Sequence, residues 1–316
     1  MTRYLIRRLL GTIPLLLGVA ILSFLFMQLA PGGPDTLYAR AGRMSDDQLA
    51  AIRHSLGLDR PTHIQLLIWL RNLAQGDLGT SYTQFRPVTT VIWEVFPNTV
   101  YLMLAGLSLS LIFGLLFGVG AAVRQYGFFD QITSFVSYFG LAMPVFWFGL
   151  MLQILFAVKL GWLPSANMRS ADGGGALDLI RHLILPAFTI AIGSIASWSR
   201  YVRSSTLEVL HQDYVRTARA KGIRERRVLR GHVLRNALIP FVTVISIDIP
   251  LYLTGAVLTE TVFSWPGMGR LFYDSLTKRD YPVLMGILLL GALLIVIGNL
   301  VADILYGILD PRIKYR

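Results

Sequence analysis

The segment of this chain best suited to engage another molecule runs from Asp213 to Gly222 and reads DYVRTARAKG. Asp213 is typical of a helix N-cap, because its carboxylate can accept backbone N–H groups that the first turn leaves unpaired. Gly222 is typical of the residue that ends a helix in a left-handed conformation. Tyr214, Val215 and Ala218 fall on one face between these ends. The sequence therefore predicts a helix about 12 Å long with defined ends, against which another protein could press.

The loop around this segment is strongly basic. Between positions 200 and 235, ten Lys and Arg residues accompany only Glu208, Asp213 and Glu225. Such a loop cannot cross a bilayer, and an excess of Lys and Arg marks the cytoplasmic side of membrane proteins. A solvated loop attracted to anionic lipid headgroups would carry the same charges. The charge of the loop alone therefore leaves two alternatives, a helix that docks on another protein and a loop that lies against lipid headgroups.

No residue pattern in the chain predicts catalysis. The phosphate-binding pattern G-x-x-x-x-G-K-[ST] is absent, so any ATP hydrolysis must occur on a partner. The patterns H-E-x-x-H and G-x-S-x-G are also absent, which disfavours a membrane hydrolase. Without cysteine, disulfides and thiolate metal sites are excluded. We assign no catalytic residue, metal site or resident cofactor, since the five histidines are scattered along the chain: His54, His63, His182, His211 and His232.

Composition indicates a membrane protein that crosses the bilayer several times. Hydrophobic residues make up 54% of the chain, charged residues only 15%, and the mean hydropathy is +0.58. A net charge of +11 is compatible with nucleic-acid binding. The charges, however, lie in loops between apolar runs, which favours a membrane topology with its positive side inside and no nucleic-acid partner.

Six apolar runs are long enough to cross about 30 Å of hydrocarbon. An even number places both termini on one side, and the basic loop makes that side cytoplasmic. The first run is too long for a signal peptide and no A-x-A-like site follows it, so we expect it to be retained. The predicted fold class is an all-α membrane protein with six transmembrane helices, at about 9–30, 99–123, 133–158, 179–199, 238–261 and 282–306.

These runs divide the chain into three parts. Residues 1–30 form the cytoplasmic N-terminus and first span, residues 31–98 an extracytoplasmic helical segment, and residues 99–316 the transmembrane core with its cytoplasmic loop 200–237. Within the outer segment, Ser45 and Gln48 form a capping box for a helix that Gly57 can close. Helical spacing of apolar residues predicts a second helix after Pro61 and a third amphipathic stretch over 87–96.

Some residues inside the expected spans are candidates for a transport pathway. Asp248 is a mid-membrane acid, which either faces a pathway or is paired or protonated within the bundle. Pro144 can kink the third span, with Phe146 and Trp147 either lining the pathway or simply packing.

The sequence ETVFSWPGMGRL leaves the fifth span on the outer side. It either folds back as an outer gate or forms an interfacial turn anchored by its tryptophan. Its candidate gate residues are Glu260, Trp265, Pro266 and Gly267.

Several motifs together resemble one protein family over nearly the whole chain. They are DYVRTARAKG followed by HVLRNALIP, and RYLIRRLLGTIPLLLGV, LAPGGP, LGLDRP, GDLGTSY, FPNT, MPVFWFGL, GWLP, RHLILPA, ETVFSWPGMGRL and ADILYGILDPRIKY. The chain resembles the permease subunits of bacterial ATP-binding-cassette importers, specifically those of the dipeptide, oligopeptide and nickel family.

This resemblance implies a type I importer permease in the bacterial inner membrane. Its implied partners are a second homologous permease, two ATPase subunits that bind ATP and Mg, an extracytoplasmic solute-binding protein and membrane lipid. The short cytoplasmic helix of the family docks in a cleft on the ATPase. The implied coupling residues are Asp213, Tyr214, Arg216, Thr217, Ala218, Arg219, Ala220, Lys221 and Gly222.

This chain departs from the general Glu-Ala-Ala pattern of that loop. Arg216, Thr217 and Ala218 occupy the three positions, so the contacts of the family's glutamate do not carry over. The implied substrates are dipeptides or oligopeptides first, with nickel chelates, glutathione or oligosaccharides as alternatives. A self-sufficient secondary transporter is a distant alternative, which Asp248 supports slightly and the basic loop disfavours.

Overall fold

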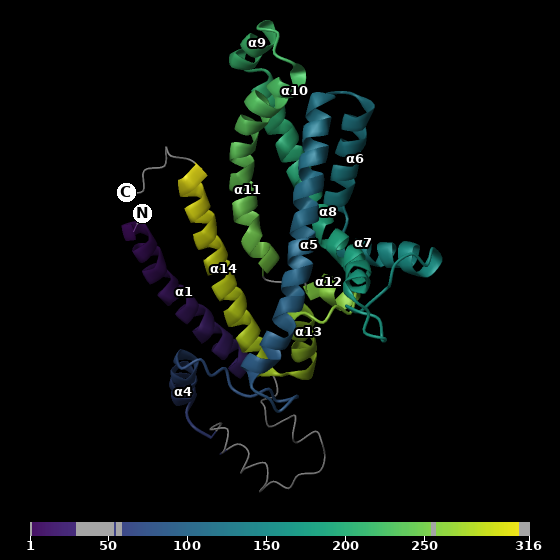
Figure 1. Cartoon of the computed structure of the whole chain (residues 1–316). Helices are drawn as coiled ribbons and strands as arrows, with labels where there is room; N and C mark the ends of the chain where they lie inside the picture. The colour runs from purple at the N-terminus through teal and green to yellow at the C-terminus, as the bar shows by residue number, and fades with distance from the viewer. Residues whose placement is uncertain (1, 30–53, 55–58, 254–256, 310–316) are drawn as a thin grey trace.

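Long helices whose axes are roughly aligned dominate the computed structural model of the chain (Figure 1). The structure describes residues 2–29, 54, 59–253 and 257–309. Helix α1 begins and helix α14 ends on the same side of the molecule (Figure 1). The five longest helices are α1 (Thr2–Leu29), α5 (Val88–Val123), α8 (Ala176–Leu210), α11 (Arg235–Leu253) and α14 (Tyr281–Leu309).

Four helices in the described ranges are long and apolar enough to cross a membrane, or five if one bent pair counts as a single span. The four are α1, α5, α8 and α14, and the bent pair joins α6 (Phe128–Ala142) to α7 (Val145–Leu152) and its continuation η1 (Gln153–Lys159). The all-α membrane class is thus confirmed, whereas the predicted number of six exceeds these spans. Helix α11 occupies most of the expected fifth span and ends at Leu253.

The third expected span is broken at Pro144, where the sequence predicts a kink. Helix α6 ends at Ala142, and the chain turns by 111° before α7 begins at Val145. Pro144 stands directly before α7 with φ −60°. Because proline has no backbone N–H and restricts the residue before it to extended conformations, it ends α6 and favours the start of a new helix.

Helices α5 and α8 form the largest helix contact in the described chain. Three glycines of α5 face α8 where a side chain would not fit. A Cβ atom on Gly106 would lie 3.3 Å from Ile190, one on Gly114 would lie 3.1 Å from Trp198, and one on Gly118 would lie 2.7 Å from the Ser199 carbonyl oxygen. Small residues let membrane helices approach closely where no hydrophobic force drives them together. These glycines therefore allow close packing of α5 against α8.

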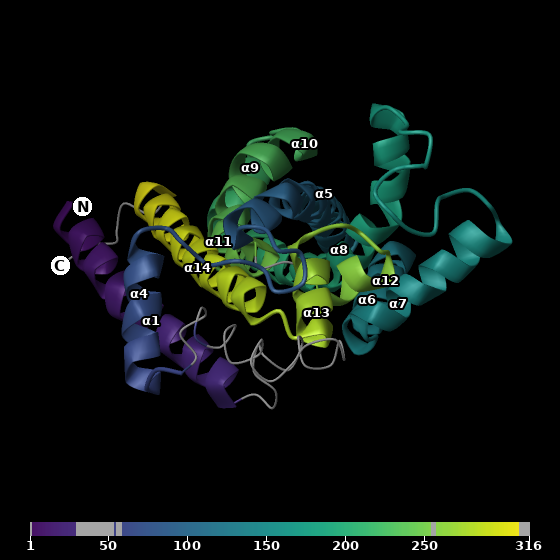
Figure 2. The ribbon, with the colours of Figure 1, turned by 90° about the horizontal axis from the view of Figure 1, so that it is seen from below.

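Helix α4 (Thr62–Ala74) lies in the outer segment and begins directly after Pro61, as predicted. It lies against α1, with the ring of Trp69 5.9 Å from that of Phe24 (Figure 2). The predicted capping box at Ser45 and Gln48, and Gly57 with it, lie outside the described residues. The amphipathic stretch 87–96 is helical, but it belongs to α5, which runs unbroken across the predicted boundary at residues 98 and 99.

Candidate functional site

Helix α9 (Asp213–Ala220) lies at the end of the molecule reached by α8, beyond the end of α5 (Figure 1). The predicted short helix is confirmed, but its N-cap is Gln212 rather than Asp213. Gln212 has the extended conformation of a cap, φ −70° and ψ 145°, and no side chain bonds to the helix start. Asp213 lies one position later, in the first turn. Its negative charge there still interacts favourably with the helix dipole. Its nearest cation is Arg216, with Oδ1 and Nη1 3.7 Å apart.

The other end of α9 is closed as predicted, by Gly222 in the left-handed region at φ +73°. The Gly222 N–H donates to the Arg219 carbonyl oxygen at 2.9 Å, and the Ile223 N–H donates to that of Ala218 at 3.3 Å. These two bonds form a Schellman motif, which satisfies carbonyl groups that the helix end leaves unpaired. Ile223 and Ala218 belong to the same apolar cluster, which is the hydrophobic contact that often accompanies this motif.

One face of α9 is buried in a small apolar cluster of its own. Val215 and Ala218, with exposed fractions of 0% and 5%, pack with Val228 and Val233. Ala218 therefore lies beneath the helix and supports it rather than contributing to its outer surface. The remaining predicted coupling residues are exposed: Asp213, Tyr214, Arg216, Thr217, Arg219, Ala220, Lys221 and Gly222.

Two polar contacts tie α9 to the chain that follows it. Arg219 donates two hydrogen bonds to Glu225, from Nε at 3.1 Å and from Nη2 at 2.7 Å. The Arg219 guanidinium lowers the pKa of Glu225, and the carboxylate raises that of Arg219 in return. The Tyr214 hydroxyl accepts a hydrogen bond from Asn236 Nδ2 at 3.2 Å. Helix α9 is thus attached at both ends of its exposed face.

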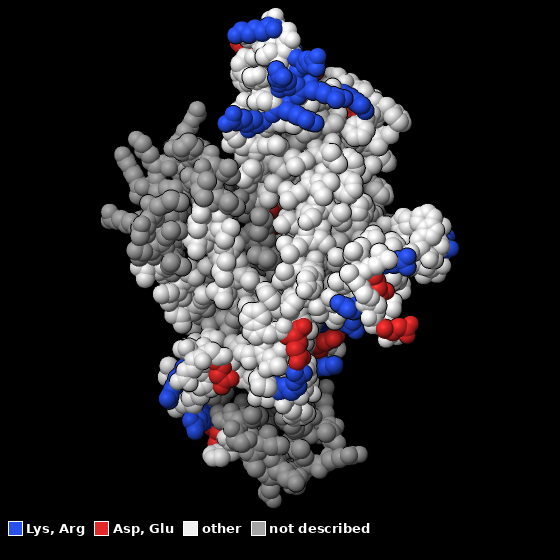
Figure 3. All heavy atoms as spheres, in the orientation of Figure 1, with Lys and Arg blue, Asp and Glu red and all other residues white. Residues whose placement is uncertain are grey.

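The chain beyond α9 forms a second helical segment that is rich in arginine. It starts as α10 (Glu225–Val228), continues as a π-helical segment, η2 (Leu229–Leu234), and joins α11 directly. Figure 3 shows Lys and Arg gathered over α9 and α10, a broad and almost uncharged band below them, and both signs of charge at the opposite end. This distribution matches the charge asymmetry of a membrane protein with its basic side in the cytoplasm.

A second candidate site lies in the turn between α12 (Val257–Val262) and α13 (Met268–Lys278). Trp265 in this turn is fully buried, and its Nε1 donates to the Asn98 carbonyl oxygen at 2.8 Å. Asn98 Nδ2 donates in turn to the Pro266 carbonyl oxygen at 2.8 Å. A tryptophan buried in this way favours the folded-back segment over the interfacial anchor. We call residues 257–278 the outer hairpin.

Glu260 stabilises the outer hairpin through buried hydrogen bonds. Its side chain is fully buried, and its carboxylate accepts the Thr99 hydroxyl at 2.9 Å and the Arg270 N–H at 3.0 Å. The Thr99 hydroxyl oxygen also accepts the Met268 N–H at 2.7 Å. Buried carboxylates are costly unless they are hydrogen-bonded. Glu260 therefore holds the hairpin against α5 in this conformation, rather than lining an open path.

Asp248 on α11 is in contact with α8. Its Oδ2 accepts the indole N–H of Trp198 at 2.7 Å, and the residue is half-buried. Nearby, the Tyr252 hydroxyl donates to Ser194 Oγ at 2.5 Å and lies 2.9 Å from Ser110 Oγ. These contacts link α5, α8 and α11 through polar groups. Asp248 is thus hydrogen-bonded, and because it is only half-buried, part of its surface is also accessible to solvent.

The structure places the remaining pathway candidates on α7. Pro144 produces the expected break, whereas Phe146 and Trp147 are 43% and 44% exposed. Another face of α7 meets the outer hairpin, because a Cβ atom on Gly149 would lie 3.1 Å from the ring of Phe263. The break thus carries α7 to the hairpin, while no contact described for the chain joins Phe146 or Trp147 to Asp248.

Sequence reasoning missed a buried acid at the start of α14. Asp280 accepts four hydrogen bonds from one short segment: the Ser81 hydroxyl at 2.5 Å, the Tyr82 N–H at 3.0 Å, and the Thr83 hydroxyl and N–H at 2.7 and 3.2 Å. Its partners are about 200 positions away in the sequence. No local pattern could have paired them, although the motif GDLGTSY marked the segment. Within the described ranges, no group of three or more His, Asp or Glu side chains could hold a metal ion.

Comparisons with known proteins cover the whole chain. Residues 114–315 match the family model described as "Binding-protein-dependent transport system inner membrane component", and residues 1–103 match the model of the N-terminal part of such components. The chain is 47% identical to the oligopeptide transport system permease protein AppB of Bacillus subtilis. The match covers the full length of both proteins.

Other relatives carry related names. Identity is 42%, over all of both chains, with the di/tripeptide transport system permease protein DppB of Pseudomonas aeruginosa. It is 43%, again over all of both chains, with the glutathione transport system permease protein GsiC of Pectobacterium atrosepticum. Among solved structures, an inward-facing MetNI methionine ABC transporter chain has a TM-score of 0.58 at 15% identity, covering 70% of this chain and 97% of its own. At that identity the likeness concerns the fold alone.

Proposed function

Because the chain belongs to the family of inner-membrane components of binding-protein-dependent transport systems, we propose that it is the permease subunit of an ATP-driven importer of short peptides. The likeness to peptide permeases over the full length of the chain carries this proposal. A permease subunit is not itself catalytic, so the energy for transport comes from ATP hydrolysis on partner subunits.

The coupling site in this proposal is the exposed face of α9. A helix can transmit force to a membrane domain only if it is held firmly at its base, and Val215 and Ala218 supply that base. The Schellman motif at Gly222 fixes the helix end, and the Arg219–Glu225 pair connects it to α10. Closure of the ATPase subunits around ATP and Mg would move α9, and α8 and α11 would move with it. ATP drives transport because the ATPases bind the two permease conformations with different affinity.

The proposed topology has six spans with both termini and α9 in the cytoplasm. Helices α11 and α12 together make the fifth span, and the bent pair α6 and α7 makes the third. Helix α4 and the turn after α12 then face outwards, where a solute-binding protein delivers substrate. A second, homologous permease contributes the other half of the pathway, and two ATPases complete the complex.

We assign Asp248 to the pathway within this frame. It is half-buried and therefore accessible, and a charged group inside a membrane bundle usually faces a water-filled route. Its hydrogen bond from Trp198 fixes the carboxylate orientation. The outer hairpin, held to α5 through Glu260, serves as the outer closure of this route in the conformation described.

Reconstitution tests the proposal directly. The complete complex in lipid vesicles, with its solute-binding protein, would be offered dipeptides, oligopeptides, glutathione, nickel chelates and oligosaccharides in separate assays of ATPase activity and uptake. We expect stimulation by the peptide classes. Stimulation by nickel chelates or oligosaccharides alone would contradict the substrate assignment, and ATPase activity insensitive to every loaded binding protein would contradict the importer itself.

Glutathione is the second candidate substrate, because a glutathione permease is among the relatives that match over the full length. Glutathione is itself a modified tripeptide, so the same pathway chemistry serves both. Competition separates the two: an excess of unlabelled tripeptide should abolish glutathione uptake if peptides are the main substrate, and should leave it intact if glutathione has a dedicated binding protein.

A further inference from the structure

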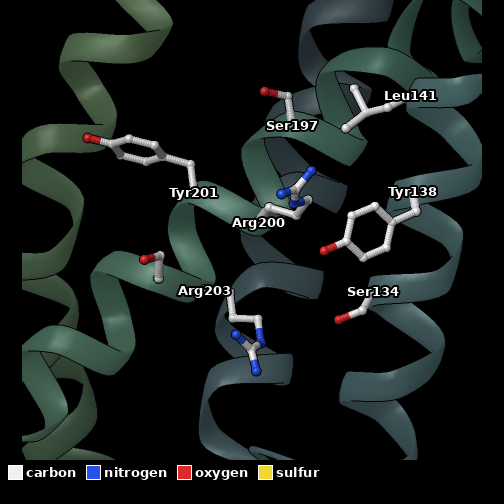
Figure 4. Close-up of a pocket in the computed structure, with 8 residues that line it drawn as sticks. Ser134, Tyr138, Leu141, Ser197, Arg200, Tyr201 and Arg203 are labelled. Carbon is white, nitrogen blue, oxygen red and sulfur yellow. The ribbon is translucent and has the colours of Figure 1, made fainter.

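A polar pocket of about 460 Å³ opens between α6 and α8, away from both sites described above. Helix α6 contributes Ser134 and Tyr138, and α8 contributes Arg200 and Arg203, together with two further serines and a tyrosine (Figure 4). None of the side chains that line the pocket is acidic. A site with several hydroxyl donors, two guanidinium groups and no carboxylate is suited to an anion.

The two arginines of the pocket differ in how their charges are balanced. Arg203 forms a bidentate pair with the buried Asp130, with Nε–Oδ1 and Nη2–Oδ2 distances of 2.6 and 2.8 Å. This pair uses two of its five donors and neutralises its charge. Arg200 is exposed and lies over the ring of Tyr138, with its guanidinium carbon 4.7 Å from the ring centroid. The cation–π contact orients Arg200 but leaves its positive charge uncompensated.

The surroundings of the pocket are apolar. On α6, Phe135, Phe139 and Leu141 have exposed fractions of 70%, 50% and 47%. Side chains of this kind, exposed on the helix that borders the pocket, match contact with acyl chains rather than water. An anion with an apolar portion beside its charge would therefore fit this surface.

We propose that this pocket binds the phosphate of an anionic phospholipid from the cytoplasmic leaflet. The inference rests on the proposed topology, which places Arg200 at the cytoplasmic end of the fourth span. Arg200 pairs with the phosphate, the serine hydroxyls donate to its oxygens, and the exposed apolar side chains of α6 contact the acyl chains. Basic pockets between transmembrane helices on the cytoplasmic side are suited to such headgroups, and the leaflet there is rich in anionic lipid.

The test measures lipid retained by the complete importer complex. Complexes are taken from nanodiscs that contain phosphatidylglycerol and phosphatidylcholine in equal amounts, and the bound lipid is counted by native mass spectrometry. Arg200→Gln removes the charge and leaves a shorter, uncharged polar side chain. Arg181→Gln is the matched control, because Arg181 is also exposed on α8 but lies at its other end, outside the pocket.

We expect the wild type and the Arg181→Gln variant to retain phosphatidylglycerol in preference to phosphatidylcholine. Arg200→Gln should reduce that preference about fivefold, the effect of one basic side chain at a membrane surface. Tyr138→Leu, which removes the ring beneath Arg200, should reduce it in the same direction. Unchanged retention in both variants would overturn the proposal.

Two further measurements distinguish other occupants of the pocket. Inorganic phosphate at millimolar concentration should not displace phosphatidylglycerol, whereas full displacement would assign the pocket to a soluble anion and overturn the lipid assignment. Pull-down of the second permease should be equal for wild type and Arg200→Gln. Loss of that subunit with unchanged lipid retention would show that the pocket is a subunit interface, which also contradicts the proposal.

Discussion

A Cβ atom on Gly267 would lie 2.4 Å from Oε2 of Glu260, so the carboxylate occupies the space that any side chain at position 267 would need. The backbone of Gly267 has φ −110°, which every residue adopts, and glycine is therefore required by space alone. Glu260 cannot move aside without losing the Thr99 and Arg270 bonds. The turn of the outer hairpin is thus fitted around one buried acid.

Replacing Gly267 by alanine should therefore destabilise the protein. Crowding in a packed interior costs about 1–3 kcal/mol, and we expect a lower thermal unfolding temperature in a fluorescence-monitored melt. Gly193→Ala is the control, because a Cβ atom at that position of α8 meets nothing within 4 Å. Equal melting of the two variants would contradict the role of Glu260.

Substitution of Gly222 should uncouple ATP hydrolysis from transport. The space around Gly222 is open, so valine there would cost free energy through the left-handed backbone alone, about 1–2 kcal/mol or more. Asparagine tolerates that conformation and should retain most function. We expect Gly222→Val to lose ATPase subunits on copurification, with an unchanged melting temperature of the membrane part. Normal transport by Gly222→Val would show that α9 is not the coupling element.

The Arg219–Glu225 pair should stabilise α9 in a defined pH range. Arg219 lowers the pKa of Glu225 below its ordinary value of 4.5, so between the two values the unfolded chain binds more protons than the folded one. The stabilisation is complete above 4.5 and is lost as the pH falls through the lower, folded value.

Hydrogen exchange of the α9 amides measures this effect. At about pH 7, Glu225→Gln should speed exchange by an amount that corresponds to about 0.2–1 kcal/mol, as expected of an exposed pair. High salt should reduce the difference between variant and wild type, because the pair is solvent-exposed. A difference that is insensitive to salt would assign the effect to packing instead.

Asp280→Asn should loosen the attachment of residues 81–83 to the start of α14. Four donors point at this carboxylate, and an asparagine would turn its own NH₂ group towards some of them. A buried donor left without an acceptor costs about 1–3 kcal/mol. We expect a lower unfolding temperature, and faster proteolysis within 76–87. The exposed Asp172 provides the control, since Asp172→Asn should change neither measurement.

Asp248→Asn should separate the pathway role of Asp248 from its structural role. The asparagine oxygen can still accept the Trp198 indole N–H, so the hydrogen bond survives and the charge does not. We expect uptake to fall at least about tenfold, while the free energy of unfolding stays within about 1 kcal/mol of the wild-type value. Trp198→Phe removes the donor and keeps the charge. If Asp248→Asn transported normally and Trp198→Phe did not, Asp248 would be a packing residue.

Local features of the fold were predictable from the sequence because they depend on neighbouring residues. The end of α9 at Gly222, the start of α4 after Pro61 and the break at Pro144 all follow from the backbone preferences of glycine and proline. Membrane character followed from apolar length. The N-cap was misplaced by one residue, because an aspartate is favourable both at the cap and in the first turn.

Contacts between distant segments were not predictable from a single sequence. Glu260 meets Thr99 across 161 positions, and Asp280 meets Ser81 across 199. The residues next to Glu260 and Asp280 in the sequence do not distinguish a buried structural acid from a pathway residue. Each of the two is a carboxylate at the edge of an apolar run. The burial of Trp265 was equally hidden, because tryptophan at the end of a span also suits the membrane interface.

The glycine contacts between α5 and α8 affect how a movement at one end of this subunit is transmitted to the other end. Helix α5 holds the outer hairpin at Asn98 and Thr99, and α8 leads directly into α9 at the opposite end. Because the two helices are in backbone contact, they tilt together as one lever about 54 Å long. A rotation of about 5° would displace one end by about 5 Å relative to the other. In the proposed topology, a displacement of α9 would thus move the hairpin directly, without a relay of side-chain rearrangements through the membrane.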